Sequence, residues 1–162
     1  GSDDHLAMLA LERKSNTRFL HVPFAGSAQV KQNLLSRAIP VAVMNVAEGV
    51  IDQRQGVMRA LAQMGETRWA PVGDVPTLRE LGFDVIEGSM RVMAAPAGMQ
   101  APVLERLALS VRRTVEDPEF QAAAVQQNLP LRFLAPAEYA AELAALQARY
   151  QALWREYPWR EQ

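Results

Sequence analysis

The stretch that decides the fold is His21-Val-Pro-Phe-Ala-Gly-Ser27, which separates a short apolar run from a helical one. Residues 18–22 have the composition of a strand, and Pro23 should end it, because proline has no N–H for a sheet ladder. Residues 28–36 follow with apolar side chains at helical spacing. The sequence therefore predicts a strand that turns sharply into a helix.

A turn of this kind leaves backbone N–H groups pointing away from the start of the helix. These groups and the positive end of the helix dipole suit a carboxylate or another small anion. An ordinary loop in which Ser27 caps the helix explains the same residues. Both interpretations remain open from this segment alone.

Composition excludes several classes of partner. The 162 residues are enough for one domain, or for one lobe and part of another, and 49% of them are apolar. Lys and Arg number 17 against 18 Asp and Glu, so the net charge is −1. This balance gives no basic surface for nucleic acid or for a membrane. Cysteine is absent, which excludes disulfides and thiol chemistry.

Apolar runs alternate with helical segments along the chain. Further strands are expected at 39–46, 57–62, 85–95 and 129–134. Helices are expected at 3–11 and 47–53, from Pro102, at 118–127 and from Pro136. This alternation predicts an α/β fold with a mainly parallel sheet flanked by helices.

Local signals mark several ends of these elements. Thr77-Leu-Arg-Glu80 has the spacing of a capping box, and Gly82 stands where a helix C-cap belongs. Asp117-Pro118 is typical of a cap followed by the first helical residue. Near the C-terminus, the sequence suggests packing anchors for the last helix at Trp154, Tyr157 and Trp159.

The inventory of catalytic groups is small. The two histidines, His5 and His21, stand neither at metal-ligand spacing nor beside a nucleophile signature. The sequence has no serine elbow, no P-loop and no dinucleotide glycine pattern. We therefore predict a binding protein rather than an enzyme, with no cofactor and no metal.

Several segments in order resemble one known family. The His21–Ser27 stretch resembles the HVPYKG segment of the Bug family, the periplasmic solute-binding proteins of tripartite tricarboxylate transporters. The run 73–82 resembles its DVPT-x-x-E-x-G segment, and 95–107 resembles its APAGTPAPVVxRL segment. Asp117-Pro-Glu-Phe120 and Pro136 with Glu138-Tyr139 are similar to its DPE and TPEEF positions.

The resemblance implies a type II periplasmic-binding-protein fold, whose two lobes close on a small carboxylate. It also implies that this chain is incomplete relative to that two-lobed fold and lacks the half with the signal peptide. Residues 1–95 would form part of the second ligand-binding lobe, and residues 96–162 the helical elements that return to the first. The protein is then expected to be exported to the periplasm.

The resemblance also places candidate ligand-binding residues. Ser2 and Asp3 fall at one ligand-facing helix start, with Gly1-Ser2 taken as native sequence. Asn45 stands at a strand end where many members have Asp, and Met90-Arg91 replaces the tryptophan–aromatic pair that is usual in the family. The other ligand-facing helix start is formed by Phe24, Ala25, Gly26 and Ser27.

The predicted function is capture of a small carboxylate for a tripartite tricarboxylate-type transporter, whose membrane subunits are the partners of the full-length protein. The alternative is a sensory or protein-interaction domain that reuses the same lobe. In either case we expect no nucleic-acid partner. Because a single lobe would leave apolar surface uncovered, we also expect a homodimer in concentrated solution.

Overall fold

The computed structural model describes residues 1–158, which divide into two compact units. One unit holds residues 1–89 and 153–158, and the other holds residues 90–152. Trp159, one of the expected packing anchors, lies outside the described residues.

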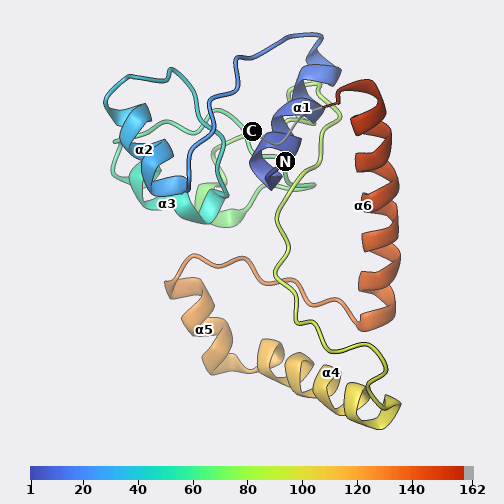
Figure 1. The fold of residues 1–162 in the computed structure, drawn as a ribbon. Helices are drawn as coiled ribbons and strands as arrows, with labels where there is room; N and C mark the ends of the chain where they lie inside the picture. Colours follow the sequence, from blue (N-terminus) through green and yellow to red (C-terminus); the bar gives the residue numbers. More distant parts are fainter. Residues whose placement is uncertain (159–162) are drawn as a thin grey trace. The chain divides into compact units, whose positions relative to one another are not determined.

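The first unit contains three helices and a short 3₁₀ turn joined by long irregular segments (Figure 1). The helices are α1 (Asp3–Ser15), α2 (Ser27–Leu35) and α3 (Val46–Arg54), and the turn η1 covers Ala70–Val72. Ser2 caps α1, since its hydroxyl accepts a hydrogen bond from the N–H of His5 at 3.3 Å. Asn16 ends α1 in the left-handed conformation, at φ 53°, which asparagine tolerates better than most residues.

The core of this unit joins α3 to the loop that follows η1. Val50 is fully buried and packs with Val72 and Val75, and Val46 and Trp69 pack against this cluster. Val46 and Val50 are one helical turn apart, so they present one apolar face of α3 to the loop. This cluster holds α3, and therefore its N-terminal end, in place.

Gln63 fixes the same loop by hydrogen bonds. Its side-chain amide donates to the carbonyls of Val72 and Val75 at 3.1 and 2.8 Å, and its side-chain oxygen accepts from the N–H of Trp69 at 2.8 Å. Its backbone forms a parallel bridge to Thr77. Gln63 is buried, and every hydrogen bond of its amide is to backbone, so its burial is fully compensated.

The second unit is built from helices α4 (Ala101–Glu116) and α5 (Pro118–Gln126) and most of α6 (Pro136–Glu156). α4 and α5 meet at a corner at Asp117 (Figure 1). The Asp117 carboxylate accepts hydrogen bonds from the N–H groups of Glu119 and Phe120 at 2.9 and 3.0 Å. In this unit, among the described residues, Ala124 alone is a buried apolar residue.

The strand predictions were wrong for this structure. Residues 1–158 contain no strand, and their ladder contacts are limited to the isolated parallel bridge between Gln63 and Thr77. The segments expected as strands are irregular at 18–22, 39–45, 57–62, 85–95 and 129–134, and Val46 already belongs to α3. A helix satisfies its own backbone, whereas a strand needs a neighbour. In residues 1–158 these segments form no strand ladder, although the N–H of Glu87 donates to the carbonyl of Met64 at 2.9 Å, so a mainly parallel sheet is not present among them.

The helix predictions were confirmed, with boundaries shifted by a few residues. Expected and observed helices coincide at α1, α2, α3, α4, α5 and α6. The box at Thr77 and Glu80 also forms: the Glu80 carboxylate accepts from the Thr77 N–H at 2.7 Å, and the Thr77 hydroxyl accepts from the Glu80 N–H at 3.2 Å. The capping box stabilises a turn rather than a helix, and Gly82, at the end of this turn, has a φ of 90°.

Candidate functional site

The N-terminal ends of α1 and α3 lie beside one another. The side-chain amide of Asn45, the N-cap residue of α3, donates a hydrogen bond to the carboxylate of Asp3, the first residue of α1, at 3.2 Å. The N–H of Asn45 is held by the Glu48 carboxylate at 3.0 Å, the reciprocal half of a capping box. Three of the predicted site residues, Ser2, Asp3 and Asn45, are therefore brought together.

The two acids at the start of α1, Asp3 and Asp4, have pKa values shifted in opposite directions. Burial acts to raise the pKa of Asp3, but hydrogen bonds from Asn45, Ser89 and backbone N–H groups outweigh it and hold that pKa below its usual value. The pKa of Asp4 is raised to about 6, first by burial and then by the negative charges of Asp3 and Glu48. Asp3 is thus a stable anion, whereas Asp4 gains a proton in mildly acidic solution.

The second predicted ligand segment forms the start of α2. Gly26 is its N-cap residue, with Ser27 as the first helical residue, and no side chain caps the helix. The N–H of Ala25 is already used, because it donates to the side-chain oxygen of Gln29 at 3.2 Å. Phe24 is half-buried. Ser27 is thus not the N-cap that the ordinary-loop interpretation required.

A pair of histidines joins this segment to α1. The rings of His5 and His21 lie 4.7 Å apart, centroid to centroid. His21 also lies 3.3 Å from the buried carboxylate of Glu12, measured from its Nε2. The chain that enters the Phe24–Ser27 turn is thereby held against α1. Arg91, the last of the predicted site residues, belongs to the second unit.

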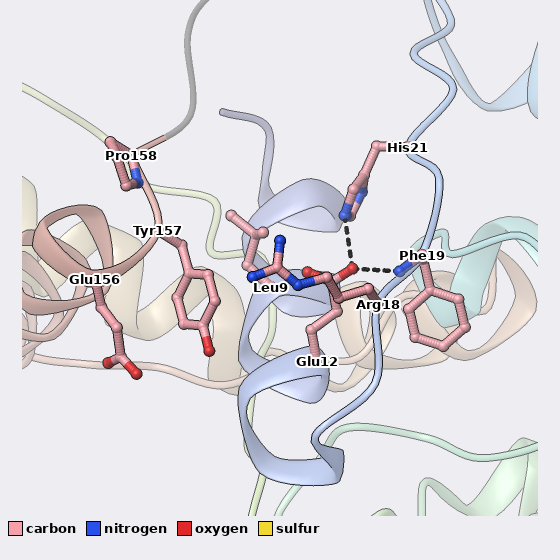
Figure 2. Close-up of a pocket in the computed structure, with 8 residues that line it drawn as sticks. All are labelled: Leu9, Glu12, Arg18, Phe19, His21, Glu156, Tyr157 and Pro158. Carbon is pink, nitrogen blue, oxygen red and sulfur yellow. Dashed lines mark hydrogen bonds and ion pairs between the residues drawn. The ribbon is translucent and has the colours of Figure 1, made fainter.

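A separate cavity of about 390 Å³ lies along α1 (Figure 2). Its walls come from α1, from residues 18–21 and from residues 156–158, all of the first unit. None of the residues predicted to bind a ligand lines it. No local sequence pattern predicts this cavity, because one group of its lining residues lies at positions 9–21 and the other at 156–158. Of these residues, His21 belongs to the His21–Ser27 segment.

The described residues offer no metal centre and no membrane span. In residues 1–158, no group of three or more histidine, aspartate or glutamate side chains is arranged to hold a metal ion. No helix within that range has both the length and the apolar character needed to cross a bilayer.

The model of the tripartite tricarboxylate transporter family receptor, TctC, matches residues 1–145. The chain belongs to this family. Its members are periplasmic solute-binding proteins, so the family is one of receptors rather than of enzymes. The family resemblance found in the sequence is thereby confirmed.

Two curated relatives are similar over most of this chain. The "UPF0065 protein in gbd 5'region" of Cupriavidus necator is 26% identical over 136 residues, which are 84% of this chain and 41% of the relative. The "UPF0065 protein in tcbD-tcbE intergenic region" of Pseudomonas sp. strain P51 is 28% identical over 165 residues, 97% of this chain and 47% of the relative. This TctC-family chain thus spans less than half the length of these two relatives.

Two solved structures share the fold. A TctC solute-binding protein from Polaromonas, solved with no ligand, is 30% identical with a TM-score of 0.79, over 96% of this chain and 54% of that one. The R. palustris protein Rpa4515, solved with adipate, is 20% identical with a TM-score of 0.83, over 96% of this chain and 52% of that one. The fold is therefore of the periplasmic-binding-protein kind found in TctC proteins, although residues 1–158 contain no strand.

Proposed function

We propose that this chain is the part of a periplasmic receptor that captures a small carboxylate for a tripartite tricarboxylate-type transporter. The observation that carries the proposal is the Asn45–Asp3 hydrogen bond, which places the starts of α1 and α3 together. Two helix starts present N–H groups and positive dipole ends to one place, and these groups hold carboxylates in water-excluding sites. Adipate in Rpa4515 supports a dicarboxylate as the ligand class.

Within this proposal, residues 1–95 act as part of the second lobe and residues 96–162 as elements that pack on the first lobe. The ligand-binding residues are Ser2, Asp3, Phe24, Ala25, Gly26, Ser27, Asn45 and Arg91. The side-chain amide of Asn45 offers N–H donors and an oxygen acceptor without a charge. It should therefore favour a plain carboxylate over a ligand that carries an ammonium group.

The proposal places a negative ligand near the carboxylates of Asp3 and Asp4. Asp4 loses this cost when it is protonated, which its raised pKa of about 6 allows in mild acid. Carboxylate capture should therefore strengthen as the pH falls through 6, because one negative charge leaves the site.

A chimera tests the proposal. This chain would replace the matching half of the Polaromonas receptor, and adipate, succinate and aspartate would be titrated into it by calorimetry at pH 5.5 and 7.5. We expect the dicarboxylates to bind, more tightly at pH 5.5. A folded chimera that binds none of the three would contradict the proposal.

An Asn45→Asp version of the chimera tests the assigned role of Asn45. The new carboxylate should move preference from succinate toward aspartate by about the value of one charge-assisted hydrogen bond, roughly 1.5–3 kcal/mol. An unchanged ratio of the two affinities would reduce Asn45 to a helix cap.

An interaction or sensory domain is the second candidate, and the surface of α4 favours it. α4 has no buried residue, and its apolar side chains Val103, Leu104 and Leu107 are 46%, 42% and 43% exposed. Exposed apolar faces of this kind mark protein contacts. Capture of a signalling partner by this chain, without any carboxylate binding by the chimera, would favour this second function.

A further inference from the structure

The cavity along α1 contains both signs of charge on its walls (Figure 2). Its negative group is the carboxylate of Glu12, and its positive group is the guanidinium of Arg18. At about 390 Å³ the cavity lies within the range of small-molecule sites. It shares no lining residue with the carboxylate site proposed above.

The carboxylate of Glu12 uses one of its two oxygens, Oε1, in the hydrogen bonds within the fold. Only 7% of the residue is exposed, and its Oε1 accepts from the N–H of Phe19 at 2.5 Å and lies 3.3 Å from Nε2 of His21. Within the described chain, every buried side-chain nitrogen or oxygen has a hydrogen-bond partner. Among the described residues no hydrogen bond to Oε2 of Glu12 is found, so this oxygen is accessible to solvent, and Glu12 lines the cavity. A carboxylate this buried gains most from a charged donor at its second oxygen.

Arg18 supplies the opposite charge without neutralising Glu12. Among residues 1–158, neither Glu12 nor any other acid forms an ion pair with Arg18, and Glu12 is paired with His21. The other acid on the cavity wall, Glu156, is held by Arg13 at 2.9 Å. The cavity therefore presents one anionic oxygen and one guanidinium, each open to a ligand.

We propose that this cavity binds a small zwitterion, an amino acid whose ammonium group meets Oε2 of Glu12 and whose carboxylate meets Arg18. The two contacts are charge-assisted hydrogen bonds, the stronger class in proteins. A dicarboxylate would bring a second negative charge to Glu12, and a diamine would bring a second positive charge to Arg18. Each of those ligands keeps one favourable contact and adds one repulsion.

Calorimetry on the 162-residue chain tests the proposal, with glycine, β-alanine, succinate and putrescine as probes. We expect glycine or β-alanine to bind, and succinate and putrescine to bind at least about tenfold more weakly. Arg18→Gln should weaken the amino acid by about tenfold, the value of one charge-assisted hydrogen bond. Arg59→Gln, which removes an exposed arginine of the same unit outside the cavity, should leave the affinity unchanged.

Glu12→Gln should also weaken the amino acid, provided that its circular dichroism shows a folded protein. If Glu12→Gln does not fold, Arg18→Gln still tests the proposal, because Arg18 is exposed and its replacement buries no unpaired group. Equal binding of succinate that Arg18→Gln removes would overturn the zwitterion in favour of a plain anion site. Absence of binding by glycine and β-alanine would overturn the site, with Arg18 then closing on Glu12 directly.

One variant distinguishes binding at the proposed carboxylate site from binding in this cavity. Asn45→Ala should leave amino-acid binding by the chain unchanged, since Asn45 does not line the cavity. Loss of amino-acid binding in Asn45→Ala, with Arg18→Gln silent, would assign the binding to the helix starts and overturn the inference. Failure of the chimera to bind dicarboxylates would leave these results unaffected.

Discussion

Asn45 donates its side-chain amide to Asp3 at 3.2 Å, across 42 positions of sequence. The contact joins the N-cap residue of α3 to the first turn of α1. One hydrogen bond from a neutral amide to a carboxylate thus links the two helix starts. A charge at position 45 would therefore act on Asp3 directly.

Asn45→Asp should destabilise the free chain near neutral pH by about 1 kcal/mol, because a hydrogen bond to a carboxylate is replaced by repulsion at a solvent-exposed place. The two carboxylates would raise each other's pKa in the folded state. The loss of stability is then complete above the raised pKa values of the folded state. It disappears as the pH falls through them toward the pKa of a carboxyl group in the unfolded chain. Thermal unfolding at pH 7.5 and pH 4 measures it, with Asn45→Ser as the uncharged control. A penalty of equal size at both pH values would contradict this explanation.

Asp4 should make the chain less stable as the pH rises from about 4 to 6. Its folded pKa is about 6, against 3.8 as the ordinary value. The folded state therefore binds more protons in this window, and stability falls as they leave. Asp4→Asn should remove this slope and stabilise the chain above pH 6 by about 1 kcal/mol, a value reduced for solvent screening of a half-exposed group. Melting temperatures from pH 4 to 8 check it, and Glu66→Gln should keep the wild-type slope.

Gln63→Leu should lower the free energy of unfolding by about 3 kcal/mol. The change leaves the Val75 carbonyl and the Trp69 N–H without their side-chain partner. It also removes one of the two hydrogen bonds to the Val72 carbonyl, which keeps the one from the Val75 N–H at 2.9 Å. Guanidinium unfolding followed by tryptophan fluorescence measures the loss. Gln55→Leu, at an exposed position of the same unit, is the matched control and should change stability by less than about 0.5 kcal/mol. If both variants lost a similar free energy of unfolding, the side-chain hydrogen bonds of Gln63 would not explain the effect.

Self-association should depend on the exposed apolar stripe of α4. Leu104 and Leu107 are one turn apart and more than 40% exposed, so a second copy can cover them at little cost. Light scattering at high concentration should show a dimer. The double change Leu104→Glu and Leu107→Glu should give a monomer, whereas Arg106→Glu on the same helix should not. A wild-type chain that is monomeric at millimolar concentration would count against this expectation.

The helices could be predicted from sequence because their signals are local. Asp117 caps α5 with its own carboxylate two and three residues on, and Ser2 caps α1 in a comparable way. Such contacts join residues two or three positions apart, so the local sequence is enough to predict them. The expected strands had the right composition, but composition does not supply the hydrogen-bonding neighbour that a strand requires.

The site was predictable only in part for the same reason. The resemblance to a family picked out Asp3 and Asn45, but their contact joins distant parts of the chain and no local pattern announces it. Glu12 was overlooked because on α1 it occupies an ordinary helical position next to Arg13 and Lys14. Its burial comes from residues 19–21 folding back over it, which is a tertiary event.

The bridge at Gln63 also decides how the chain opens. The N–H groups of Gln63, Trp69 and Leu78 each donate to an acceptor of this small network, at 2.9, 2.8 and 2.9 Å. Their exchange with deuterium requires this network to break as a whole. Within residues 1–158, no backbone hydrogen bond is formed by the N–H groups of the irregular segment 41–44. Solvent should thus label residues 41–44 early and residues 63–78 late. In the first unit, slow exchange is then expected in a loop as well as in the helices.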